Sequence, residues 1–113
     1  MLSRPYRFPL SREFKQLKKT GRLTNGPLFA ILVKEKEGLS RFGFVVSKLI
    51  DKRATVRHRV KRLLAEAVRL NLEKIKPGCD VVFLTKKSLP GKTFRETEAE
   101  VLRMMARAGL GKS

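Results

Sequence analysis

The chain has 113 residues, and its 27 Lys and Arg against 10 Asp and Glu give a net charge of +17. This length suits a single domain, and a hydrophobic content of 42% is enough for one modest core. This charge indicates that the protein has an anionic partner, because the positive charges of so basic a compact chain repel one another. The composition favours nucleic acid as that partner over an anionic membrane or an acidic protein.

The sequence also bears on location. The longest apolar run, LFAILV at 28–33, has six residues, far fewer than the roughly 18 of a membrane-spanning helix. The N-terminal MLSRPYRFP has no apolar stretch after its charges, so we expect neither a signal peptide nor a membrane location. Cys79 is the only cysteine, which excludes an internal disulfide and fits a reducing environment, so we expect a cytoplasmic protein.

The first predicted element is a basic helix. Residues 1–10 are expected to be irregular because Pro5 and Pro9 interrupt them. Ser11 can accept hydrogen bonds from the free N–H groups of a first helical turn, which predicts that the helix begins there. Gly21 is a typical stop signal, so the helix should end near it.

Three strands are predicted from apolar, β-branched runs. Residues 28–34 are apolar on both faces, which is typical of a central strand. A short polar connection with Gly38 follows, so residues 41–47 are expected to pair with them as a hairpin. The run CDVVFLTK at 79–86 predicts a further strand after the central helix, in β–helix–β order.

Two further helices complete the predicted domain. The central helix is marked by an apolar stripe at steps of three and four, formed by Val56, Val60, Leu63, Leu64, Ala67 and Asn71. Thr93 followed by Glu96 is a capping-box signature for a last helix that ends near Ala108. No linker or repeat interrupts the sequence, so residues 1–113 are expected to form one α+β domain.

The densest charge lies at the start of the central helix and just before it. Seven of the fifteen residues from 48 to 62 are Lys or Arg, namely Lys48, Lys52, Arg53, Arg57, Arg59, Lys61 and Arg62. Glu66 has the spacing to pair with Arg62 and Arg69. Three cations (Arg57, Arg59 and Lys61) then have no acid within one turn, and like charges so closely spaced favour phosphate binding over a merely solvated face.

The sequence offers no constellation for catalysis. It has no Gly-rich phosphate loop, no Ser/His/acid set and no cluster of metal ligands, so we expect no catalytic residue and no metal site held by the protein alone. His58 is expected to hydrogen-bond a phosphate or a ribose 2′-hydroxyl, or to help an RNA hold an ion. Phe14 and Phe29 sit on apolar stripes typical of a core, but they could also form a stacking platform for unpaired bases if one sheet face is uncovered.

Three motifs together resemble a known family. They are Glu13-Phe14 in the basic helix, RFGFVVSK at 41–48, and VRHRVKRLLAEAVR at 56–69. In this order they resemble the protein component of bacterial ribonuclease P, and the resemblance runs from about residue 10 to 108. It implies an α/β sandwich in which three helices pack on a four-stranded sheet, with a left-handed βαβ crossover.

The resemblance also implies a function. The family's protein binds a large catalytic RNA and the 5′ leader of precursor tRNA, which the RNA cleaves to form the mature 5′ end. Catalysis belongs to the RNA and its Mg²⁺ ions, and the resemblance implies no obligate protein partner. The alternative is a ribosomal or other structural RNA-binding protein without a role in cleavage, and a stand-alone nuclease is a third possibility.

The resemblance places RNA contacts on the central helix and its preceding loop. Together with the neighbouring polar side chains, the expected RNA-binding residues are Lys48, Lys52, Arg53, Arg57, His58, Arg59, Lys61 and Arg62. His58 stands where the family's motif has Asn. The leader is expected in a cleft between the first helix and the sheet, lined by Arg12, Phe14, Lys18 and Phe29.

Overall fold

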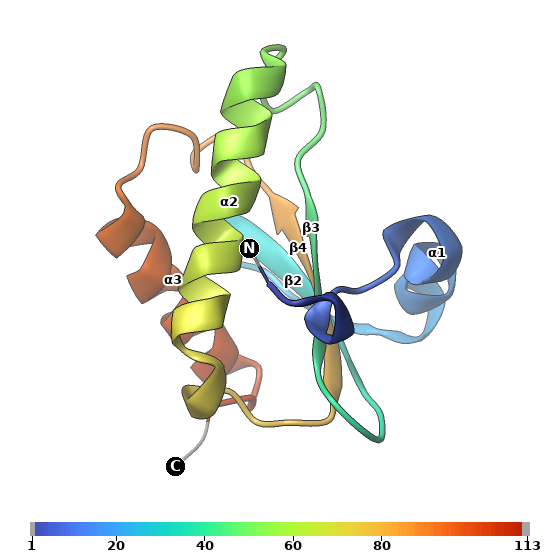
Figure 1. Ribbon diagram of the computed structural model, residues 1–113. Helices are drawn as coiled ribbons and strands as arrows, with labels where there is room; N and C mark the ends of the chain where they lie inside the picture. Colours follow the sequence, from blue (N-terminus) through green and yellow to red (C-terminus); the bar gives the residue numbers. More distant parts are fainter. Residues whose placement is uncertain (1, 112–113) are drawn as a thin grey trace.

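The computed structural model describes residues 2–111, which form a four-stranded mixed sheet and three helices. The helices are α1 (Leu10–Thr20), α2 (Ala54–Leu70) and α3 (Phe94–Arg107), and the strands are β1 (Arg22–Thr24), β2 (Phe29–Glu35), β3 (Arg41–Val45) and β4 (Cys79–Thr85). Figure 1 shows α2 and α3 on one side of the sheet and α1 on the other. The α+β class, the four strands and the three helices are therefore confirmed. None of the described helices has the length and apolarity needed to cross a bilayer.

The order of the strands corrects the predicted hairpin. The sheet runs β1-β2-β4-β3, so β4 lies between the two strands that were expected to pair. It is antiparallel to β2 and parallel to β3. Nearly every residue of β4 is buried, and a central position lets such a strand bury both faces and bond along both edges. The shorter β3, which carries Arg41 and Gly43, takes the edge instead.

The connection from β3 through α2 to β4 joins two neighbouring parallel strands. The predicted β–helix–β order is therefore confirmed. The left-handed sense that the family resemblance implies for this crossover stays a prediction.

The N-terminal segment is more ordered than expected and covers the free edge of β3. Residues Arg4–Tyr6 form a short 3-10 turn, and Arg7 then bridges to Phe42 of β3. The backbone N–H of Phe8 donates to the Phe42 carbonyl at 3.0 Å. This pairing occupies hydrogen-bonding groups that an edge strand would otherwise expose. The prediction of an irregular segment is wrong for residues 4–8, and Met1 lies outside the described residues.

The two predicted helix starts have different outcomes. The first helix begins at Leu10 rather than Ser11, and its N-cap is Pro9, which makes no side-chain cap. The Pro9 carbonyl accepts from the backbone N–H groups of Arg12 at 3.2 Å and Glu13 at 3.0 Å, so the first turn closes without a capping hydroxyl. The capping box of α3 is confirmed, because the Glu96 N–H donates to Thr93 Oγ1 at 3.1 Å and the Thr93 N–H donates to Glu96 Oε1 at 3.0 Å.

The two faces of the sheet carry cores of different size. The larger core packs the sheet against α2 and α3 and includes Phe29, Phe42 and Phe83, each at most 2% exposed. The smaller core lies under α1 and consists of Phe8, Leu17, Leu32 and Val82. Because strand residues alternate between faces, neighbours along β2 belong to different cores.

Arg41 joins α1 to the sheet. Its Nε and Nη2 donate to the two carboxylate oxygens of Asp80 on β4, at 2.9 and 2.8 Å. Its Nη1 and Nη2 donate to the Glu13 carboxylate on α1, at 3.2 and 2.8 Å. Its guanidinium carbon lies 5.2 Å from the ring centroid of Phe8. The hydrogen bonds from Arg41 hold the pKa of Glu13 below its ordinary value, and those to Asp80 and Glu13 raise the pKa of Arg41.

Replacing this arginine should destabilise the fold strongly. We expect Arg41→Gln to lower the free energy of unfolding by about 2–4 kcal/mol, because it leaves the nearly buried Asp80 carboxylate without a counter-ion. Arg69→Gln is a matched control, since its pair with Glu66 is far more exposed and should lower the free energy of unfolding much less. Urea unfolding of the two variants measures both values. An equal decrease in the free energy of unfolding in both variants would show that the ion pairs of Arg41 stabilise the fold no more than a surface ion pair does.

Candidate nucleic-acid interface

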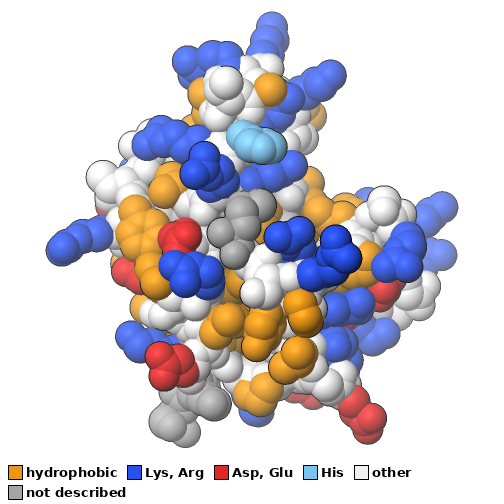
Figure 2. Space-filling view, in the orientation of Figure 1, with side chains coloured by type: hydrophobic (Ala, Val, Ile, Leu, Met, Phe, Trp, Pro, Cys, Tyr) orange, Lys and Arg blue, Asp and Glu red, His pale blue; other side chains and the backbone are white. Residues whose placement is uncertain are grey.

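The exposed side of α2 carries uncompensated positive charge. Its inward side holds Val60, Leu64, Ala65, Ala67 and Val68, all buried against the sheet and α3. Of the cations on this helix, Arg59 and Arg62 are exposed, whereas Arg57 and Lys61 lie at the edge of the packed side and are half-buried. We call Arg57, Arg59, Lys61 and Arg62 the basic arc. Figure 2 shows Lys and Arg side chains gathered around the single histidine on this face of the molecule.

The acids near the basic arc neutralise other residues. Glu66 pairs with Arg69, so of the two partners predicted for it only Arg69 is confirmed. Among residues 2–111, Arg59 and Arg62 make no ion pair and no hydrogen bond. Both side chains are exposed on α2. Their guanidinium groups are therefore free to bind an anion.

Arg57 has a structural contact that its sequence position did not reveal. It is half-buried, and its Nη1 donates to the backbone carbonyls of Asp51 at 3.0 Å and Lys52 at 2.8 Å. The Asp51 carboxylate pairs in turn with Arg53 at 3.0 Å, and this hydrogen bonding lowers the pKa of Asp51. Arg57 thus fastens the loop to the first turn of α2, while part of its guanidinium group stays available.

The loop before α2 presents an unexpected apolar tip. Leu49 is 82% exposed, the most of any large hydrophobic residue in the described chain, and it lies in a turn between Lys48 and Ile50. Lys48 and Lys52 are exposed on either side of it.

On the other face of the sheet, the structure brings together two of the four predicted cleft residues. Lys18 Nζ lies 5.4 Å from the centroid of the Phe14 ring, one turn away on α1. Phe14 is half-buried and packs at the margin of the smaller core. This pair presents an aromatic surface next to a cation, which suits an unpaired base and its phosphate.

The other two predicted cleft residues lie elsewhere. Phe29 is fully buried in the core under α2 and α3, on the face of the sheet opposite α1, so its assignment to the cleft is wrong and its core alternative is correct. Arg12 is exposed but lies two residues from Phe14, nearly on the opposite flank of α1. It lines a small hollow between α1 and the sheet with Gln16 and Lys34, so its assignment to the leader cleft stays a prediction.

Two residues that were not predicted for the cleft share the margin of the smaller core with Phe14 and form a floor there. Val45 and Leu84 are directly paired across β3 and β4, are half-buried, and lie on the α1 side of the sheet. Gly43 leaves room for α1 to pack on the sheet, since an added Cβ would lie 3.1 Å from Leu10 Cδ2 and 3.3 Å from Val82 Cγ2. The sequence did contain a signal for them, because a helix as short as α1 cannot cover every apolar residue on this face of the sheet.

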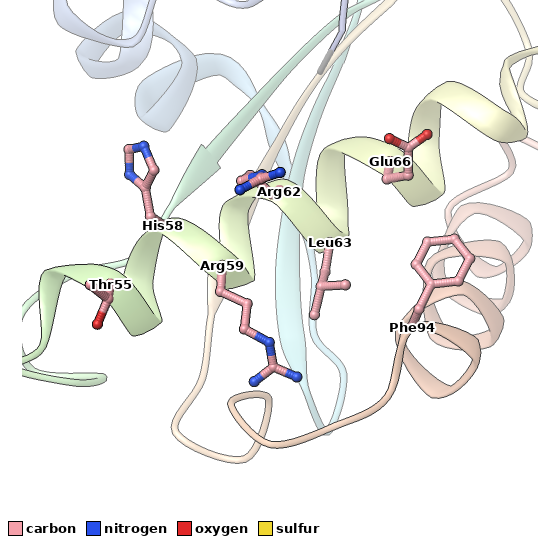
Figure 3. A pocket seen from close by; sticks show the side chains of 7 residues that line it. All are labelled: Thr55, His58, Arg59, Arg62, Leu63, Glu66 and Phe94. Carbon is pink, nitrogen blue, oxygen red and sulfur yellow. The ribbon is translucent and has the colours of Figure 1, made fainter.

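A second hollow lies between α2 and the start of α3. We call it the α2–α3 groove; its volume is about 610 Å³, and it is lined by Thr55, His58, Arg59, Arg62, Leu63, Glu66 and Phe94. Figure 3 shows that all but Phe94 come from α2. Phe94 packs at the margin of the larger core and is half-buried. Three of the five predicted RNA-binding residues on α2, His58, Arg59 and Arg62, therefore line a groove with an apolar component.

Comparisons with known proteins agree on one family. The family model for ribonuclease P matches residues 2–109. A ribonuclease P protein component from Clostridioides difficile (strain 630) is 38% identical over 100 residues, which cover 87% of each chain. One from Clostridium kluyveri is 34% identical over 110 residues, covering 95% of this chain and 97% of the relative. The solved ribonuclease P protein of Thermotoga maritima has a TM-score of 0.83 at 28% identity, covering 89% of this chain and 96% of that chain.

The contact of Arg57 with the loop can be tested in the isolated protein. Arg57→Ala removes two hydrogen bonds to the loop carbonyls, each contributing about 1 kcal/mol, so local opening should become roughly five- to thirtyfold more frequent. Amide hydrogen exchange across residues 51–57 measures this opening. Arg59→Ala is the matched control and should leave exchange unchanged, because Arg59 has no such bonds within residues 2–111. Equal exchange in both variants would contradict the structural role of Arg57.

Proposed function

The chain belongs to the family of ribonuclease P protein components, and we propose that it binds the catalytic RNA and the 5′ leader of precursor tRNA in the cytoplasm. The observation that carries this proposal is the basic arc, whose Arg59 and Arg62 lack partners within residues 2–111. Arginine forks match the geometry of phosphate oxygens and contact them through two donors at once. Each contact releases condensed counterions, which makes the binding strong and salt-dependent.

The 5′ leader would lie on the face of the sheet that carries α1, opposite α2 and the basic arc. Phe14 and Lys18 from α1, with Val45 and Leu84 as a floor, offer an aromatic and apolar surface beside a cation. Unpaired bases stack on such surfaces with little regard for sequence. From Val45 the chain runs through the loop of Lys48 and Lys52 directly into α2, so the cleft and the basic arc are joined by a basic connection.

We propose that this chain binds and positions RNA, and that the RNA performs the cleavage. Magnesium ions, when bound, would neutralise the charge that develops on the cleaved phosphate. We assign these ions chiefly to the RNA, because residues 2–111 contain no group of three or more His, Cys, Asp or Glu side chains placed to hold a metal ion. The protein's contribution is the affinity for the leader and the neutralisation of RNA phosphates.

Reconstitution tests this function directly. Adding the purified chain to a bacterial ribonuclease P RNA at low magnesium should restore cleavage of precursor tRNA at the mature 5′ end. No stimulation at any protein concentration would contradict the proposal. Copurification with ribosomal RNA in its place would support a structural RNA-binding protein, and cleavage by a chain stripped of all RNA would support a stand-alone nuclease.

Removing a free arginine should change the salt dependence of binding. Arg59→Ala is expected to weaken association with the catalytic RNA and to reduce the slope of log affinity against log salt by about 0.7–0.9, the effect of one phosphate contact. Arg69→Ala is the matched control, because Arg69 is already paired with Glu66. Filter binding at several salt concentrations measures both slopes. Identical slopes in Arg59→Ala and the unaltered chain would remove Arg59 from the interface.

The aromatic residue of α1 should act on the leader alone. Phe14→Ala is expected to weaken binding of precursor tRNA to the reconstituted complex by roughly five- to a hundredfold, the loss of one stacked base. Mature tRNA, which has no leader, should bind as it does to the unaltered complex. An equal loss for both RNAs would identify Phe14 as a residue of the smaller core.

A further inference from the structure

The α2–α3 groove is built from one helical row and one facing side chain. Thr55, Arg59, Leu63 and Glu66 recur at steps of four, four and three, so they line one side of α2. Phe94 faces them from the first residue of α3 (Figure 3). The capping box at Thr93 fixes the backbone there, so the ring is held by an ordered helix start and not by a loose loop.

The groove is polarised along α2. Arg59 and Arg62, with His58, lie towards the N-terminal end, Leu63 lies in the middle, and Phe94 lies opposite the end that carries Glu66 (Figure 3). Glu66 closes the other end, where its carboxylate is already paired with Arg69. An anionic group is therefore attracted to the end with Arg59 and Arg62 and disfavoured at the end with Glu66.

Phe94 also differs from the core aromatics. Phe29, Phe42 and Phe83 are at most 2% exposed, whereas Phe94 is half-buried and its ring lines the groove. A volume of about 610 Å³ lies within the roughly 300–1,000 Å³ of sites that hold small ligands. The groove thus combines room for a planar group, an aromatic surface to stack on at one end, and free guanidinium groups towards the other.

We propose that the α2–α3 groove binds one unpaired nucleotide of the partner RNA, an inference that rests on the proposed function and deepens it. The base stacks on Phe94 and contacts Leu63, while its flanking phosphates bind Arg59 and Arg62. This occupant follows from charge complementarity, since it is the unit of RNA that joins a flat apolar ring to an anion. The groove adds a contact that depends on an unpaired base, beyond the phosphate contacts of the basic arc.

Two variants of one residue separate stacking from charge. Phe94→Leu keeps an apolar side chain but removes the aromatic face, so it should weaken binding to a bacterial ribonuclease P RNA by about five- to a hundredfold. The salt slope should stay that of the unaltered chain, because no phosphate contact is lost. Phe94→Tyr keeps the ring and should bind within about twofold of the unaltered chain. Tyr6→Leu, a half-buried aromatic in a different hollow, is the control and should have no effect.

Photo-crosslinking tests the same contact in the unaltered chain, so the result does not depend on whether Phe94→Leu folds. The ribonuclease P RNA is transcribed with 5-iodouridine, irradiated in the complex, and digested for mass spectrometry. A crosslink to Phe94 supports the proposal. Its absence, together with equal affinities of Phe94→Leu and the unaltered chain, overturns it and leaves the proposed function intact.

Failure of the proposed function gives a different pattern. An unaltered chain that binds no ribonuclease P RNA would refute that function. The groove is then tested with a single-stranded decauridylate and the same variants. A Phe94→Leu chain that binds this oligonucleotide as tightly as the unaltered chain would refute the nucleotide site as well.

Discussion

The ion pairs around Arg41 govern how this very basic chain holds together. The protein has 27 cationic side chains and 10 acids, so few of its charges can be paired internally. Two of the five ion pairs within residues 2–111 converge on Arg41, where Asp80 and Glu13 tie β4 and α1 to β3. Acids used at this junction are absent from the outer face of α2. Glu13 and Asp80 thus hold α1 on the sheet. Because the chain has few other carboxylates, Arg59 and Arg62 stay free to bind an external anion.

The position of α1 determines what each side of the sheet can do. Because α1 has only 11 residues, it covers a small core and leaves Val45 and Leu84 partly open beside Phe14. The opposite face carries α2 and α3 (Figure 1) and the larger core beneath them, so its contacts with RNA are expected chiefly from the outer surface of these helices. The protein thus offers an aromatic and apolar surface on one side and an arginine-rich surface on the other. The loop with Lys48 connects them.

Local signals in the sequence predicted the elements well and their lateral order poorly. The α2 stripe, the Thr93 capping box and the strand at 79–86 each depend on neighbours within a few residues, which the sequence shows directly. The central place of β4 in the sheet depends on how its burial compares with that of strands far away in the sequence. No short sequence pattern reveals this difference. Phe29 was misplaced for the same reason: β2 is apolar on both faces, so its alternation does not tell which face α1 covers. Arg57 was counted as free because its partners are backbone carbonyls, which have no sequence signature.

Electrostatic attraction alone cannot give such a protein its register on an RNA. A net charge of +17 favours every polyanion, and phosphate contacts position a protein without distinguishing one RNA segment from another. Discrimination requires contacts that only certain RNA shapes can make, and an unpaired, accessible base is one such shape. The half-buried rings of Phe14 and Phe94 lie on opposite sides of the sheet, each beside free cations. An RNA complex that presents unpaired nucleotides at both places at once would be selected over a regular duplex, which exposes none.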